Sequence, residues 1–253
     1  MGMELCNAQT WGAFDYGKGG CVMDIRVASL LEGAQSAEGV VVIIDVYRAF
    51  TTEAIAFQKG VEKIVLVAEI AEALKLRDQG VGDLCVGEVE GKRPEGFDYN
   101  NSPHELSQAD LEGKVLIHST RAGTVGVTAA KNADVIYGGS LAVAQATVDA
   151  ILKQKAEIVT LVAMGWAGYE RTDEDEQCAL YLRNLLEGRK PDENSVRSLI
   201  LAGKESQKFG DSTQPHFHAE DRDLALEVNR VDFAIRIGEE DGLLVARPEY
   251  VSG

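Results

Sequence analysis

Short apolar runs alternate with amphipathic segments along most of the chain. The clearest run, residues 40–44, consists of five consecutive β-branched residues, which is typical of a strand covered on both faces. Similar runs occupy residues 63–68, 114–118 and 158–163, and each is followed by apolar residues at helical spacing. Repeated strand–helix units predict an α/β fold with a mostly parallel or mixed sheet between two layers of helices.

Weaker patterns complete the expected order of elements. We predict strands at 21–31, 84–86 and 134–137, and two strands at 233–237 and 243–246 that pair around a glycine-rich turn. Helices are expected at 70–76, 141–154, 172–186 and 195–209, with a polar connection at 32–39. We interpret residues 1–20 as loosely held and residues 21–253 as a single α/β domain, with two similar lobes at about 21–138 and 139–253 as an option.

The strand at 40–44 delivers polar side chains to its carboxyl end. Asp45 follows it directly, and Arg48, Thr51 and Thr52 come next, just before a helix that closes at Gly60. In open α/β sheets ligands bind at this edge. The alternatives are a solvated turn with a threonine cap, or a structural salt bridge between Arg48 and Asp45.

Two further loops share this design, at 96–102 and 119–124. Arg48 and Arg121 are candidates to bind an anion, aided by backbone N–H groups near Thr52, Ser102 and Thr124. Ser102 is also an expected helix N-cap, because proline follows it directly and glutamate comes three residues later.

Carboxylates at strand ends and helix starts are the second ingredient of a possible site. Asp45, Glu88, Asp98 and Asp175 supply the oxygen ligands that Mg²⁺ prefers. An acidic run at 173–176 also suits the first turn of a helix, so its role can be structural. The pair His216 and His218 lacks matching further ligands, and we interpret it as part of a solvated loop.

Composition narrows the class of function. A net charge of −16 argues against nucleic-acid binding and against adsorption to anionic membranes. Neither GxGxxG nor GxxxxGK[ST] occurs, which disfavours a dinucleotide-dependent enzyme. The four cysteines show no CxxC spacing, and neither a signal peptide nor an apolar run of membrane length is evident. We therefore expect a cytoplasmic protein.

Together these segments resemble the 2-phosphosulfolactate phosphatase family. The resemblance rests on DxxRAxTT at 45–52, GE at 87–88, GFDxNNSP at 96–103, GT at 123–124, and ED and CA near residue 175. It covers about residues 40–186. It implies an α/β/α fold and a Mg²⁺-dependent acid phosphatase that converts 2-phospho-3-sulfolactate to sulfolactate and phosphate, an early step toward coenzyme M in some organisms.

Combining the residue patterns with this resemblance assigns a role to each candidate residue. The expected catalytic residues are Asp45, Arg48, Asp98 and Arg121. The expected substrate-binding residues are Thr51, Thr52, Asn101, Ser102, Gly123 and Thr124. The expected Mg²⁺ ligands are Asp45, Glu88 and Asp175. We also expect a homo-oligomer, most simply a dimer.

This chain departs from the family pattern in two loops. Arg121 and Ala122 stand where the family usually has threonine and asparagine, and Ala142 stands where asparagine is usual. Arg121 suggests an extra anionic group on the substrate, or a different substrate. A second hypothesis is therefore a non-catalytic α/β protein that binds a phosphorylated or sulfonated metabolite.

Overall fold

The computed structural model describes residues 23–251. In this part of the chain the strands form one ten-stranded sheet in the order β1-β8-β2-β7-β9-β10-β3-β6-β4-β5, which confirms the α/β class. The strands are β1 (Asp24–Ser29), β2 (Gly39–Ile44), β3 (Lys63–Val67), β4 (Leu84–Gly87), β5 (Tyr99–Asn100), β6 (Val115–Ser119), β7 (Ala133–Gly139), β8 (Ile158–Ala163), β9 (Phe233–Glu240) and β10 (Leu243–Tyr250).

Helices follow most of these strands. They are α1 (Leu30–Ser36), α2 (Ala49–Gln58), α3 (Ile70–Asp78), α4 (Pro103–Gln108), α5 (Gly123–Ala129), α6 (Ala144–Gln154), α7 (Asp173–Leu186), α8 (Glu193–Ala202) and α9 (Ala219–Ala225), with short 3₁₀ turns at Leu141–Val143 and Glu205–Lys208.

The sheet consists of two parallel groups joined by an antiparallel hairpin. β1, β8, β2 and β7 run parallel to one another, as do β3, β6, β4 and β5. The β9–β10 hairpin pairs antiparallel with β7 on one side and with β3 on the other. β8 lies between β1 and β2, so the sheet runs without interruption across the two segments considered as lobes.

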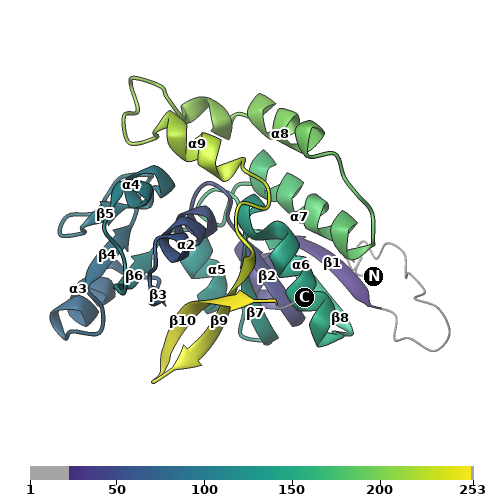
Figure 1. Cartoon of the computed structure of the whole chain (residues 1–253), viewed down its shortest axis with the longest axis horizontal. Coiled ribbons are helices and arrows are strands. Elements are labelled where there is room, and N and C mark those ends of the chain that lie inside the picture. The colour runs from purple at the N-terminus through teal and green to yellow at the C-terminus, as the bar shows by residue number, and fades with distance from the viewer. Residues whose placement is uncertain (1–22, 252–253) are drawn as a thin grey trace, which may run out of the picture.

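Helices α2 and α5 lie between the two parallel groups, with the β9–β10 hairpin below them in Figure 1. One apolar cluster joins Ile43 of β2, Phe50 of α2, Leu66 of β3 and Val127 of α5. Helices α6 and α7 pack on the other face of β2 and β8, and α3 packs on the outer face of β3, β4 and β6. The carboxyl ends of β2 and β6 therefore approach the same two helix starts, although four strands separate them in the sheet.

Two expectations for the elements were wrong. Residues 30–36 form α1, because Ala34 is buried in the apolar core and the helix contacts α5 and β8 despite the polar composition of this stretch. The helix expected over 195–209 ends at Ala202, where Gly203 takes an extended conformation, and a separate 3₁₀ turn follows. Residues 219–225 form α9, a helix for which the sequence pattern gave no prediction.

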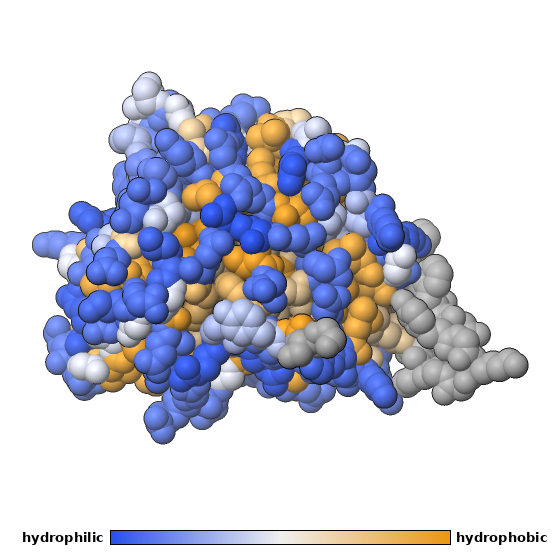
Figure 2. All heavy atoms as spheres, viewed as in Figure 1, coloured by the Kyte–Doolittle hydropathy of each residue, from blue (hydrophilic) through white to orange (hydrophobic). Residues whose placement is uncertain are grey.

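Two other expectations concern the chain ends and membrane crossing. The loosely held segment 1–20 lies outside the described residues. Among residues 23–251, none of the helices has the length and apolar character needed to cross a bilayer. On the face shown in Figure 2, hydrophilic side chains cover most of the surface and hydrophobic ones show between them near the middle.

Candidate active site

A cavity of about 310 Å³ lies at the carboxyl ends of the parallel strands. The loops after β2, β4, β6 and β8 all contribute to its wall, so loops from both parallel groups of strands meet at one cavity. The cavity is lined by Asp45, Tyr47, Arg48, Glu88, Val89, Glu90, Gly91, Asn101, Arg121, Ala122, Gly165, Trp166, Ala167, Tyr169 and Phe217.

Asp45 joins the starts of α2 and α5. Its Oδ1 accepts a hydrogen bond from Ala49 N at 3.1 Å, and its Oδ2 accepts one from Gly123 N at 2.9 Å. A Cβ at position 123 would lie 2.7 Å from the Ala49 side chain and 3.1 Å from Asp45 Oδ2, so glycine is needed for this approach. The Asp45 carboxylate thus occupies the helix N-termini that the sequence suggested for an anionic ligand.

The surroundings of Asp45 raise its pKa to about 6. Burial is the main cause and the charge of Glu88 adds to it, while the N–H groups of Ala49 and Gly123 act in the opposite direction. A carboxyl group with such a pKa changes its proton occupancy close to neutral pH. Asp45 is therefore suited to general acid–base or nucleophilic chemistry in this cavity.

Asp175 supports two loops that line the cavity. Its Oδ1 accepts from Val46 N and its Oδ2 from Gly165 N, both at 2.8 Å, so it links the loops after β2 and β8. Burial raises its pKa well above the usual range, and the nearby charges of Glu174 and Asp45 raise it further. Asp175 does not line the cavity, and the contacts just described are those of a loop brace.

Arg48 lines the cavity, but protein groups hold its guanidinium. Nη1 donates to Asp221 Oδ2 at 2.6 Å and to His216 O at 3.1 Å, and Nη2 donates to Gly91 O at 3.1 Å. The guanidinium also lies 5.1 Å from the centre of the Phe217 ring. The salt bridge of Arg48 is therefore with Asp221 and not with Asp45.

Glu88 and Arg121 meet at the rim of the cavity. Glu88 accepts hydrogen bonds from Arg121 N at 2.9 Å and from Gly91 N at 2.8 Å, which fixes the loops after β4 and β6 together. The Arg121 side chain is exposed, and its guanidinium has no ion-pair partner among residues 23–251. Arg121 is thus a cation that a ligand can bind without breaking an ion pair within residues 23–251.

The predicted threonines are buried and lie outside the cavity lining. Thr51 Oγ1 donates to Val46 O at 2.9 Å, and Thr124 Oγ1 donates to Thr120 O at 2.8 Å. The amide of Thr52 donates to Arg48 O, and that of Thr124 to Thr120 Oγ1. Because these N–H groups already donate to protein acceptors, they are not free to bind an anionic ligand.

Ser102 is the N-cap of α4, as the sequence indicated. Its Oγ accepts a hydrogen bond from Glu105 N at 3.1 Å and donates one to Asp221 Oδ1 at 2.6 Å. The amide of Ser102 donates to Asn100 O. Asn101, the preceding residue, is the member of this segment that lines the cavity.

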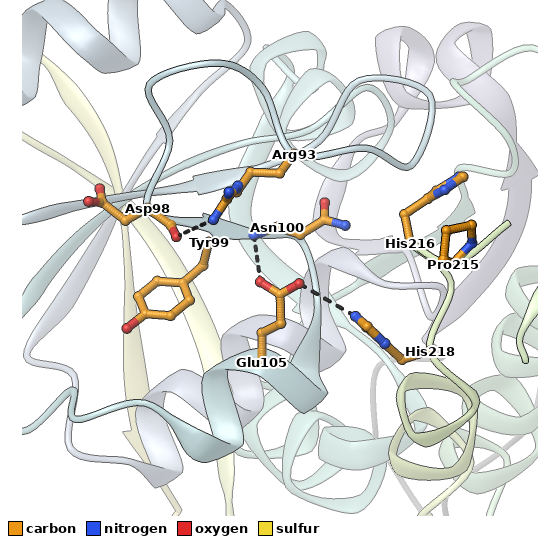
Figure 3. Close-up of a pocket in the computed structure, with 8 residues that line it drawn as sticks. All are labelled: Arg93, Asp98, Tyr99, Asn100, Glu105, Pro215, His216 and His218. Atoms are coloured by element: carbon orange, nitrogen blue, oxygen red, sulfur yellow. Dashed lines mark hydrogen bonds and ion pairs between the residues drawn. The ribbon is translucent and has the colours of Figure 1, made fainter.

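Asp98 lies in a second hollow, of about 530 Å³. This hollow is lined by Arg93, Asp98, Tyr99, Asn100, Glu105, Pro215, His216 and His218 (Figure 3). The carboxylate of Asp98 points away from the other lining residues and accepts from Cys85 N at 2.7 Å and from Arg77 Nη1 at 3.1 Å. These contacts hold the loop before α4 against β4.

The two histidines of the second hollow do not converge on a common point. His218 points toward Glu105, with 3.5 Å between Nε2 and Oε1, whereas the ring of His216 points away from that pair (Figure 3). Glu105 Oε2 also accepts a hydrogen bond from Asn100 N. This arrangement does not form a shared metal site.

Sequence reasoning missed several residues of the cavity and its support. Trp166 and Tyr169 lie in the glycine-rich loop after β8, and the strand-end rule used for the other loops points to this loop as well. Asp221, the partner of Arg48 and Ser102, carries no local signal because it lies more than a hundred residues from both.

The carboxylates of the cavity can hold a hard cation. Among the described residues there is no cluster of three or more His, Cys, Asp or Glu side chains placed to bind a metal. Mg²⁺, however, usually binds through only one or two carboxylates together with substrate phosphate and water. Asp45 and Glu88 both line the cavity, so the donor set fits Mg²⁺ shared with a phosphate ligand.

Comparison with known proteins gives a consistent result. A family model described as 2-phosphosulpholactate phosphatase matches residues 26–222. A probable 2-phosphosulfolactate phosphatase of Bacillus subtilis is 30% identical over 208 residues, which cover 79% of this chain and 87% of the relative. One of Thermoplasma volcanium is 27% identical over 212 residues, covering 84% and 89%. One of Carboxydothermus hydrogenoformans is 39% identical over 140 residues, covering 55% and 58%.

Proposed function

Because the chain belongs to the 2-phosphosulfolactate phosphatase family, we propose that it hydrolyses a small anionic phosphate monoester, with 2-phosphosulfolactate as the first substrate to test. The matched segment, residues 26–222, includes every residue that lines the 310 Å³ cavity. One cavity carries the proposal: it joins a buried carboxyl group of pKa about 6, Asp45, to the Arg121 guanidinium, which has no ion-pair partner among the described residues.

Arg121 and Asp45 have different roles in the proposed hydrolysis of the phosphate ester. Arg121 binds the oxygens of an anionic group in the two-point geometry of a guanidinium. Asp45 acts in its ionised form, either as the base that takes a proton from water or as the group that attacks phosphorus. The ester bond breaks, water supplies the hydroxyl group and the proton, and the products are an alcohol and inorganic phosphate.

Mg²⁺ is part of the proposal. Asp45 and Glu88 would hold it, and the bound cation would neutralise charge on the phosphoryl group. The charge balance of the cavity supports this, because Asp45, Glu88 and Glu90 all line it and would otherwise repel an anionic substrate. Activity that persists after exhaustive EDTA treatment would count against this role of Mg²⁺.

The first experiment is a phosphate-release assay with 2-phosphosulfolactate and p-nitrophenyl phosphate, with and without Mg²⁺. We expect turnover by the wild-type protein and a loss of more than about 100-fold in kcat for Asp45→Asn. The altered residues Arg121 and Ala122 favour a second function, binding of a phosphorylated or sulfonated metabolite without turnover. Binding of 2-phosphosulfolactate without phosphate release would support that alternative.

Three further expectations follow from the sequence and remain predictions. We propose that the protein assembles as a homodimer, that it lies in the cytoplasm and that its sulfolactate product serves coenzyme M synthesis in organisms that make this cofactor. Light scattering of the purified protein tests the first of these directly.

A further inference from the structure

A buried carboxylate–imidazole pair lies directly behind the wall of the cavity. Glu53 of α2 and His118 of β6 are each about 1% exposed, and His118 Nδ1 lies 2.9 Å from Glu53 Oε1. The other ring nitrogen, Nε2, lies 3.3 Å from Oδ1 of Asn101. Because Asn101 lines the cavity, these three side chains run in series from the protein interior to the site.

Burial restricts where the protons of this pair can lie. A pair with one negative charge would have to be stabilised away from water, and Glu53 Oε2 has no hydrogen-bond partner within the described part of the chain. Burial also raises the pKa of Glu53, while its hydrogen bond to His118 acts in the opposite direction. A pair without net charge is therefore favoured.

A proton on Glu53 Oε2 would have no acceptor in the described part of the chain, so the shared hydrogen of a pair without net charge lies between Oε1 and Nδ1. Each such arrangement places a hydrogen on His118 Nε2. If Glu53 is ionised, the imidazolium carries hydrogens on both nitrogens. If Glu53 is protonated, its hydroxyl donates to Nδ1, and the neutral ring carries its hydrogen on Nε2. In both cases Nε2 donates to Asn101 Oδ1, which fixes the orientation of the Asn101 carboxamide.

The fixed carboxamide leaves its NH₂ group for a ligand. Asn101 Nδ2 has no hydrogen-bond acceptor in residues 23–251. It is not one of the fully buried side-chain atoms that lack a partner, so a ligand in the cavity can reach it. The backbone of Asn101 is also held, because its N–H lies within hydrogen-bonding distance of Gly87 O and Asn100 Oδ1. The cavity therefore contains a preorganised neutral donor as well as the Arg121 guanidinium.

We propose that Glu53 and His118 are positioning residues that hold the Asn101 carboxamide with Nδ2 toward the cavity, where it donates to an oxygen of the reacting phosphoryl group. This inference rests on the proposed phosphatase function and extends it to two buried residues that do not touch the substrate. A donor held in place before the reaction stabilises developing charge without reorganisation. The charge of His118 also lowers the pKa of Asp45 against the larger effect of burial, so the pair lies within electrostatic reach of that carboxylate.

A double-mutant cycle tests whether His118 acts through Asn101. We expect Asn101→Ala and His118→Phe each to lower kcat by roughly 100-fold with little change in KM. The double variant should be no slower than either single variant, since both remove the same interaction. If the two losses multiply, His118 acts independently of Asn101 and the proposal is wrong.

A conservative variant covers the case in which His118→Phe does not fold. In His118→Gln the side-chain amide can still donate to Asn101 Oδ1, so we expect it to keep at least about tenfold more activity than His118→Phe or Asn101→Ala. Equal loss in His118→Gln and Asn101→Ala, with both proteins folded by circular dichroism, would overturn the positioning role.

NMR spectroscopy gives a readout that does not depend on turnover. In protein labelled with ¹⁵N-histidine, we expect Nε2 of His118 to be protonated at neutral pH, and we expect the Asn101 side-chain NH₂ signals to shift when inorganic phosphate is added. An unprotonated Nε2 would refute the inference, and so would Asn101 side-chain chemical shifts that do not change when phosphate is added to saturation. If the wild-type protein releases no phosphate from any ester, the proposed function fails, and these spectra still decide how Asn101 is oriented.

Discussion

At the scale of single residues, Arg121 is the cation of the cavity that remains available to a ligand. Its guanidinium lies at the cavity without a protein partner in the described residues. We predict that Arg121→Thr lowers kcat/KM for the best phosphate ester by about 10- to 100-fold, because one charge-assisted contact to the substrate is lost. Steady-state kinetics of both proteins measure this change.

The same substitution should leave stability almost unchanged, within about 0.5 kcal/mol, because the exposed guanidinium has no ion-pair partner among residues 23–251. Lys131→Thr is a matched control, since it removes an exposed cation just beyond the opposite end of α5. We expect its kcat/KM to equal that of the wild type. An equal loss of activity in both variants would indicate a general charge effect and not a contact at the cavity.

Asp45 should make stability depend on pH. Its folded pKa, about 6, is raised above the ordinary value of 3.8, so its contribution to folding is full below pH 4 and is lost as the pH rises through 6. At 1.36 kcal/mol per pKa unit this loss is about 3 kcal/mol. Asp45→Asn cannot ionise, so the unfolding free energy of the wild type should fall relative to this variant between pH 4 and pH 7.

Urea denaturation of both proteins at several pH values in EDTA measures this difference. Other buried carboxyl groups, such as Asp175 and Glu174, are present in both proteins, so most of their effect cancels in the comparison. A difference that stays constant from pH 4 to pH 7 would show that Asp45 titrates normally in the folded protein.

At the scale of elements, the N-terminus of α4 depends on a contact that its sequence does not reveal. The Ser-Pro-x-Glu pattern predicts that Ser102 caps α4, and the structure confirms the bond from Glu105 N. It also shows that Ser102 Oγ donates to Asp221, the buried partner of Arg48. Ser102 therefore links a helix cap to a buried ion pair.

We predict that Ser102→Ala costs about 2 kcal/mol of stability, because it removes a cap and also one donor to a buried carboxylate. Asp192→Ala is the matched control. Asp192 caps α8 through Ser195 N at 2.6 Å and is exposed, so its loss should cost about 1 kcal/mol. Thermal unfolding of the two variants compares the costs directly. Equal costs would mean that the bond to Asp221 contributes little.

The elements show how far local pattern predicts this protein. The continuous apolar runs in the sequence correctly predicted β2, β3, β6 and β8. Each of these strands is buried on both faces, so most of its residues are apolar. Helix α1 was missed because its buried side depends on contacts with distant elements, β8 and α5. The same limit applies to the site. Asp45 and Arg121 carry strand-end signals, whereas the partners of Arg48 and Asn101 are set by tertiary packing.

At the scale of the whole molecule, the order of strands couples the two halves of the chain. β1 pairs only with β8 among the described strands, and β2 lies between β7 and β8. β10 in turn pairs with β3, so the C-terminal hairpin completes the edge of the other parallel group. Each half of the chain, taken alone, therefore leaves strands without their partners: β1 lacks β8, and the β9–β10 hairpin lacks β7 and β3.

We therefore predict that the protein unfolds in a single cooperative transition and that a fragment of residues 1–138 does not fold. In the fragment β1 would lack its partner, and the apolar residues of β2 that pack against α6 and α7, such as Val42 and Ile44, would be exposed to water. Calorimetry of the full chain should give one transition whose calorimetric and van't Hoff enthalpies agree. The fragment should show no cooperative melting, whereas the co-expressed fragments 1–138 and 139–253 should regain it when they associate. Two separate transitions in the full chain, or a fragment 1–138 that melts cooperatively, would instead show that the halves are independent lobes.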